Sequence, residues 1–127
     1  DVTHPPDVAR AARGVDTLVL LAAAGMGNTI EEVKAIEFDA VVDSVAALGQ
    51  DANRLGDGES ESDAEGEDPL GRVRDLRVVL CSSMGTTQFL GDDFGQILHW
   101  KLNAEAFLSS SSIPSTIVKP CGLTNDP

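Results

Sequence analysis

The stretch that decides the fold is LRVVLCSSMGTT at residues 76–87, followed by ILHWKLNAEAFLSSSSIPSTIVKPCGL at residues 97–123. Residues 76–81 form a short apolar run with β-branched content, which is typical of a buried strand. A helix is expected near 93–109, and a second strand over 116–119. This half of the chain therefore has the order strand, helix, strand.

The same alternation is expected earlier in the chain. The apolar run TLVLLA at 17–22 predicts a strand. Thr29 and Glu32 then have the spacing of a capping box, which satisfies free amides at a helix start. One apolar stripe follows at helical spacing: Phe38, Val41, Val42, Val45 and Leu48. Gly49 stands where a left-handed C-cap would end this helix.

Residues 50–72 interrupt the pattern, because Gly, Ser, Asp and Glu dominate and no periodicity survives. Seven acidic residues between 57 and 68 supply much of the formal net charge of -12. We interpret 50–72 as a flexible acidic insertion in solvent, with a docking segment for a basic partner as the alternative. Its charge would repel phosphates, so we expect no nucleic-acid partner at this surface.

These elements predict one α/β domain over residues 1–127, with the order strand, helix, strand, helix, strand and an acidic loop insertion. Strands joined through helices pair in parallel, and right-handed crossovers would put both helices on one face of the sheet. The core must be aliphatic, since aromatic residues make up 4% of the chain and Tyr is absent. No apolar run reaches the roughly 18 residues that suggest a membrane span, so none is expected.

Small residues follow each predicted strand. In a parallel sheet the three strand ends share one edge, where open sheets bind ligands. Small side chains there would let a flat ligand approach the backbone, although strand ends are commonly small and Gly-rich for structural reasons alone. The three groups are Ala22, Ala23 and Ala24, then Ser82 and Ser83, then Pro120, Cys121, Gly122 and Leu123.

A Ser pair, a Lys in the next helix and a Pro-Cys-Gly-Leu turn occur in this order at 82–83, 101 and 120–123. The arrangement resembles the later half of a short-chain dehydrogenase/reductase domain of the atypical NAD(P)-binding branch. The motifs Ser-Met-Gly, Trp-Lys-x-x-Ala-Glu and Ile-Pro-x-Thr-Ile-Val are similar to those of a plant and algal subgroup. The resemblance implies a partial Rossmann-type domain over 1–127, with NADP or NAD as cofactor.

The resemblance also implies roles for single residues. Ser83, with Ser82 as the other match, would contact the substrate oxygen, and Lys101 would hold the nicotinamide ribose. Residues 120–123 would contact the carboxamide. Asp1 and Val2 look like the end of the third strand of such a domain, near the adenine, and Ala22 to Ala24 look like the end of its fourth strand, near the adenine ribose. The implied cofactor-binding set is Asp1, Val2, Ala22, Ala23, Ala24, Ser82, Lys101, Pro120, Cys121, Gly122 and Leu123.

Two departures from the family pattern bear on activity. The family has a Tyr four residues before the Lys, and this chain has Ile97, which cannot donate a proton. The glycine-rich fingerprint is also missing, because Gly25-Met26-Gly27 is followed by Ile30 where a third glycine would stand. Pyrophosphate binding would lose its main anchor, so we expect another segment or other protein chains to complete the cofactor site.

The expected function is an NAD(P)-binding protein that acts as an NADPH-dependent reductase with weak or lost catalysis. The alternative is a non-catalytic scaffold or assembly subunit of a larger, photosynthetic complex. The helix near 93–109 has two partly apolar sides, which favours contact with something besides the sheet. A third alternative is a nucleotide or redox sensor. The resemblance places the protein in the plastid stroma or at the periphery of a membrane complex, with the cytoplasm as the alternative.

The remaining candidate residues give weaker indications of a functional role. His99 has no Asp or Ser at triad-like spacing, so a packed or surface role is expected. Cys81 and Cys121 end two predicted strands that could be neighbours, so a redox pair is an alternative to two small structural residues. No His and Cys cluster has metal-ligand spacing, and no metal site is expected.

Overall fold

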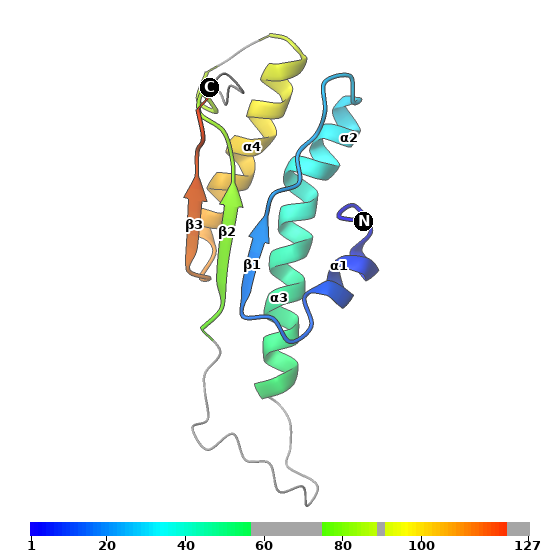
Figure 1. The fold of residues 1–127 in the computed structure, drawn as a ribbon, viewed down its shortest axis with the longest axis vertical. Coiled ribbons are helices and arrows are strands. Elements are labelled where there is room, and N and C mark those ends of the chain that lie inside the picture. Colours follow the sequence, from blue (N-terminus) through cyan, green and yellow to red (C-terminus); the bar gives the residue numbers. More distant parts are fainter. Residues whose placement is uncertain (57–74, 89–90, 122–127) are drawn as a thin grey trace, which may run out of the picture.

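The computed structural model describes residues 1–56, 75–88 and 91–121. Three strands, β1 (Thr17–Leu20), β2 (Arg77–Cys81) and β3 (Ser115–Val118), form a sheet in the order β1-β2-β3. Both pairs are parallel. Figure 1 shows the three arrows pointing the same way, so their carboxyl ends meet at one edge. The predicted α/β class and parallel topology are confirmed.

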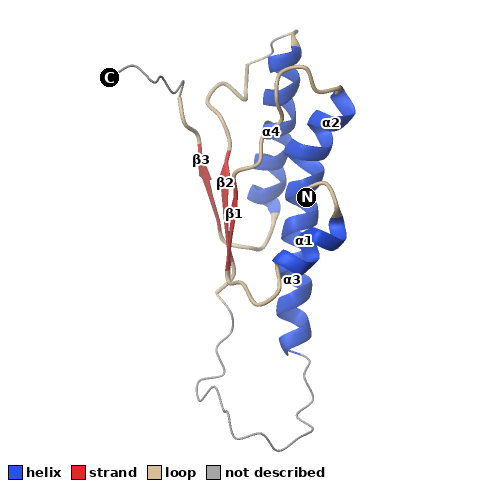
Figure 2. Ribbon diagram, turned by 45° about the vertical axis from the view of Figure 1, so that its right-hand side comes forward, coloured by secondary structure: helices blue, strands red, loops and turns tan. Residues whose placement is uncertain are grey.

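Helices cover one face of the sheet. They are α1 (Pro5–Ala11), α2 (Ile30–Lys34), α3 (Ala40–Gly56) and α4 (Asp93–Ser110), with a π-helical segment, Ala35–Asp39, between α2 and α3. Figure 2 shows all of them on the same side of the strands, as right-handed crossovers require. No helix among the described residues is long and apolar enough to cross a membrane.

The core lies between the sheet and helices α3 and α4. Alternate strand residues point into it, so Val78 and Leu80 of β2 are buried while Val19 of β1, on the other face, is 54% exposed. The core is aliphatic, as expected from the composition. Its buried cluster consists of Val41, Val45, Leu48, Val78, Leu80, Ala104 and Leu108.

The second apolar side of α4 contacts the neighbouring helical layer. The ring of Trp100 lies 5.8 Å from that of Phe38, and Phe107 meets Phe38 edge-on at 6.4 Å. Phe38 belongs to the π-helical segment before α3. The two-sided pattern of α4 thus reflects packing on both the sheet and the helix beside it.

The predicted capping box at the start of α2 is confirmed, and α4 also begins at a capped residue. Thr29 caps α2, where its side chain accepts a bond from the Glu32 amide and Glu32 bonds back to the Thr29 amide. Asp92 caps α4 and accepts from the Gly95 amide. The predicted strands and the helix near 93–109 agree with β1, β2, β3 and α4 to within two residues.

Two local expectations are wrong. Gly49 does not end its helix, because α3 continues to Gly56. The Asp51 carboxylate in this extension accepts a bond from the Gly14 amide at 2.8 Å, which ties the last turns to the loop before β1. Residues 50–56 therefore belong to α3 and not to the acidic insertion, and residues 57–72 of that insertion lie outside the described residues.

The N-terminal segment also differs from the prediction. Asp1 and Val2 lie in a turn, closed by a bond from the His4 amide to the Asp1 carbonyl at 3.2 Å, and they do not form the end of a strand. Helix α1 begins directly after His4, with proline in its first turn. Proline is suited to that position because the first helical amides have no intrahelical acceptor.

Candidate functional site at the carboxyl edge of the sheet

A hollow of about 470 Å³ lies beyond the end of β1. Asp1, Val2, Ala22 and Ala23 line it together, although they come from different segments of the chain. The structure thus gathers four of the five residues that were predicted to meet the adenosine end of a dinucleotide. Each of them is exposed, so the hollow is open to solvent.

Two carboxylates line this hollow. Asp1 accepts bonds from the amide and hydroxyl of Thr3, each at 2.9 Å. Glu32 accepts from the Thr29 amide at 2.8 Å, and this bond, helped by the Asn28 amide group, lowers its pKa below the usual range. An ionised Glu32 makes the hollow suited to hydrogen-bond donors and unsuited to phosphate.

The fifth residue, Ala24, leads to a buried ion pair. Its backbone amide donates to Oε1 of Glu37 at 2.7 Å. The other oxygen of Glu37 accepts from the ammonium of Lys101 at 2.7 Å, and the two side chains are 2% and 11% exposed. One carboxylate therefore joins the end of β1 to the inner face of α4.

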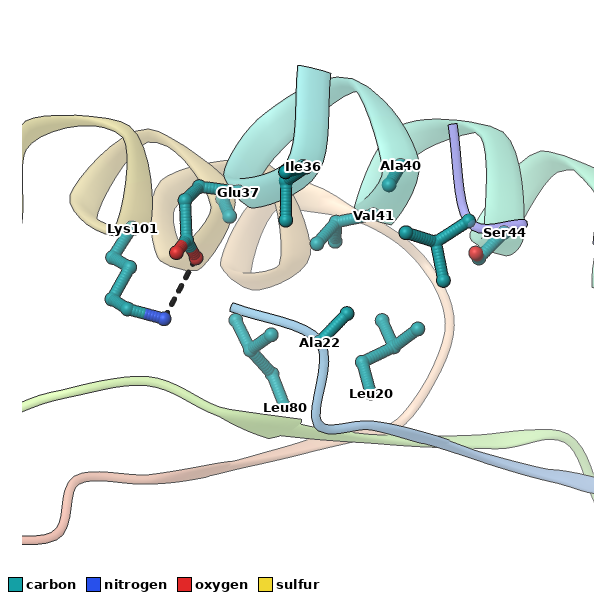
Figure 3. A pocket seen from close by; sticks show the side chains of 11 residues that line it. Leu20, Ala22, Ile36, Glu37, Ala40, Val41, Ser44, Leu80 and Lys101 are labelled. Carbon is teal, nitrogen blue, oxygen red and sulfur yellow. Dashed lines mark hydrogen bonds and ion pairs between the residues drawn. The ribbon is translucent and has the colours of Figure 1, made fainter. Parts of the chain in front are cut away.

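The ion pair borders a small cavity. Figure 3 shows it between β1 and β2 on one side and the helical segment from Ile36 to Ser44 on the other, with Lys101 reaching Glu37 at its edge. Its volume is about 20 Å³, which is room for one water molecule. A ribose does not fit beside Lys101 in this arrangement.

Glu37 reaches this position from the π-helical segment. The Ala40 amide there bonds back to the Ala35 carbonyl, which is a five-residue step. Such single-turn insertions are rare among α-helices as a whole. Where they occur, they frequently lie at functional sites. The sequence reasoning missed Glu37. Its available signal was a charged residue at four-residue spacing between Val33 and Val41, both of which are buried.

Ser82 belongs to a second polar network. Its hydroxyl donates to Glu105 of α4 at 2.5 Å. The other Glu105 oxygen pairs with Lys119 at 2.8 Å, and Lys119 also donates to the Thr86 hydroxyl at 2.9 Å. This network ties the ends of β2 and β3 to α4. Sequence reasoning did not assign a role to Glu105 or Lys119 here.

Ser83 and Pro120 lie on neighbouring strand ends. The Ser82 amide donates to the Val118 carbonyl at 2.8 Å, and the Met84 amide donates to the Pro120 carbonyl at 3.2 Å. The half-buried Ser83 side chain donates to the Met84 carbonyl at 3.1 Å. The structure thus brings the predicted Ser and Pro segments together. Lys101 is not part of this group, because its ammonium pairs with Glu37.

One further described residue of the predicted cofactor-binding set, Cys121, follows Pro120 after the end of β3. Cys121 is an exposed free thiol, and Cys81 at the end of β2 is a half-buried one. Gly122 and Leu123 lie outside the described residues, so their predicted role stays a prediction.

Ile97 occupies the place where the family pattern has Tyr. It lies one helical turn before Lys101 on the buried face of α4 and is 6% exposed. The two residues share a face because positions four apart align on a helix. A hydroxyl is therefore absent from the position beside Lys101 where the family pattern would supply a proton.

Comparison with known proteins identifies the fold class. The structure matches a protein from Bacillus halodurans, described as a candidate NAD-dependent epimerase/dehydratase, with a TM-score of 0.65 and 21% sequence identity. The match covers 94% of this chain and 46% of that protein. No protein-family profile matches, and no curated protein matches significantly.

The chain therefore has a partial Rossmann-like α/β fold. It spans less than half the length of the neighbour. The likeness gives no support to the plant and algal subgroup that the sequence motifs suggested.

Proposed function

We propose that this chain is part of an NAD(P)-binding domain of the atypical short-chain dehydrogenase/reductase type. The observation that carries the proposal is the gathering of Asp1, Val2, Ala22 and Ala23 in one hollow at the carboxyl edge of a parallel sheet. Ligands of open α/β sheets bind at this edge. The structural neighbour, whose name refers to NAD, supports the same class of ligand.

The hollow is suited to the adenosine half of the dinucleotide. Small alanines leave the backbone accessible to a flat ring. The carboxylates of Asp1 and Glu32 accept hydrogen bonds and fit an amino group or ribose hydroxyls. The pyrophosphate would lie away from these carboxylates, against residues that this chain does not provide in a glycine-rich turn.

Binding is proposed with weak or lost catalysis. If hydride transfer occurs, Lys101 would hold the nicotinamide ribose, Ser83 would contact the substrate oxygen, and the cofactor would supply the hydride. A proton donor would have to come from elsewhere, because position 97 is a buried Ile and the chain contains no Tyr. A reductase activity and a plastid location rest on the motif resemblance alone.

A titration tests the proposal. NADPH and NADH are added separately to the full-length protein, and binding is measured by nicotinamide fluorescence. Ala23→Leu fills the hollow and should weaken binding by about tenfold, which corresponds to roughly 1.4 kcal/mol. Ala46→Leu, at an exposed position of α3, is the matched control and should bind as the unaltered protein does. Absence of saturable binding for both nucleotides would contradict the proposal.

The bare face of the sheet favours a second candidate, a non-catalytic scaffold. Val19, Leu21 and Val118 are exposed there, and Leu21 is 70% exposed. An apolar surface of this kind is a contact surface for protein. A scaffold should keep its partner after bound nucleotide is stripped, whereas a nucleotide sensor should change its affinity for the partner when NADPH is added.

A further inference from the structure

Glu37 uses both carboxylate oxygens on donors of the candidate site. One accepts from the Ala24 amide at the end of β1, and the other accepts from the Lys101 ammonium. Without this carboxylate, an amide and an ammonium would face the same oxygen-sized position at the edge where ligands of such sheets bind. Glu37 therefore fills a position in which these two donors would otherwise be open to a ligand oxygen.

The free space beside the ion pair is small while Glu37 holds Lys101. The cavity beside Lys101 is about 20 Å³, while the open hollow is about 470 Å³. Val2, Ala22 and Ile36 line both of them, so these residues form the wall between the two. A ligand seated in the hollow reaches Lys101 only when this wall opens and Glu37 releases the ammonium.

The π-helical segment gives Glu37 a means of moving. Its backbone makes the five-residue step from Ala40 to Ala35 in place of the regular four-residue bond. A change between π-helical and α-helical bonding would rotate Glu37 relative to α3. Asp39 belongs to the same segment, but its carboxylate pairs with Lys34 and is 44% exposed.

We propose that Glu37 is an internal competitor for Lys101, so that a dinucleotide binds fully only after displacing this carboxylate. The inference rests on the proposed function, and it adds a regulation of that same site. A binding-competent state that is only partly populated lowers the apparent affinity by its population. Removing the charge of Glu37 should therefore raise the affinity for NADPH.

The experiment compares four forms of the full-length protein by NADPH titration. Glu37→Gln should bind about tenfold more tightly than the unaltered protein, if the free state is roughly one tenth populated. Asp39→Asn breaks an ion pair of the same segment that does not involve Lys101, and it should leave the affinity unchanged. The double variant Glu37→Gln/Lys101→Met should lose the gain, because the ammonium that the ligand would capture is gone.

The outcomes separate this inference from the proposed function. If the unaltered protein binds NADPH and Glu37→Gln binds it no more tightly, competition by Glu37 is excluded and the proposed function stands. If none of the forms binds, both fail. Should Glu37→Gln not fold, as judged by circular dichroism, Glu37→Asp replaces it. Its shorter side chain cannot hold both donors, so tighter binding supports the inference and unchanged binding overturns it.

Discussion

Lys101 is tolerated in an aliphatic core because Glu37 neutralises it there. The side chains are 11% and 2% exposed, so both charges have lost most of their hydration. Removing one member of such a pair leaves the other buried without compensation, and that is costlier than removing both. The Ala24 amide adds a bond that holds the carboxylate in place.

The stability of single and double variants tests this coupling. Lys101→Met should lower the free energy of unfolding by about 3–5 kcal/mol, because Glu37 keeps a buried charge. The double variant Glu37→Gln/Lys101→Met should recover much of that loss, since Gln still accepts from the Ala24 amide. Urea unfolding monitored by circular dichroism measures both. A single variant as stable as the unaltered protein would show that the pair is solvated.

At the residue scale, the sequence indicated Lys101 but not its partner. The Lys stands out through its spacing from the Ser pair and the Pro-Cys-Gly-Leu turn. Glu37 lies 64 residues away in the chain, so no local pattern connects the two. Asp1, Val2, Ala22 and Ala23 were predicted from the family resemblance to lie near the adenosine end of a dinucleotide, and they share one hollow.

At the scale of single elements, local chemistry decides where helices begin. The start of α2 depends on reciprocal bonds between Thr29 and Glu32. The Thr29 amide is the main cause of the lowered pKa of Glu32 in the folded protein. In the unfolded chain that bond is absent, so the unfolded state takes up a proton at Glu32 at a higher pH than the folded state does.

This difference predicts an acid-dependent contribution to stability. The contribution of ionised Glu32 is present above the usual carboxyl pKa and is lost as pH falls through the lowered, folded-state value. Glu32→Gln should therefore be less stable than the unaltered protein at neutral pH, and the difference should shrink in acid. Urea unfolding of both proteins at neutral pH and in acid measures this difference in stability. Glu31→Gln, an exposed neighbour outside the capping box, is the control and should show a smaller change with pH.

Elements were predictable where their signals are local, and not where tertiary contacts decide. Short apolar runs located the strands, and the capping box of Thr29 and Glu32 located the start of α2. Gly49 was misinterpreted because Gly is also tolerated inside a helix, and here the helix is extended by the contact between Asp51 and Gly14. The prolines of α1 are compatible with both a loop and a first helical turn.

At the scale of the whole molecule, the helices divide the sheet into two unlike faces. On the covered face, Leu80 is 6% exposed and belongs to the core. On the other face, Val19 is 54% exposed. The topology was predictable because parallel strands with right-handed connections admit few arrangements.

The two faces should respond differently to substitution. Leu80→Ala removes buried methyl groups and should cost about 2–5 kcal/mol of the free energy of unfolding. Val19→Thr, on a neighbouring strand but on the bare face, should change it by less than about 0.5 kcal/mol. Thermal and urea unfolding of the two variants measure the contrast. Equal losses would mean that the second face is also covered in solution.

The π-helical segment has a consequence for sequence change. One residue more than a regular helix needs is accommodated between α2 and α3. Deleting a single residue there would restore four-residue bonding and leave α2 and α3 in their present relative orientation, because the wider turn already absorbs the extra residue. Deleting Glu37 itself would therefore remove the partner of Lys101 in one step, while the flanking helices keep the faces that they bury.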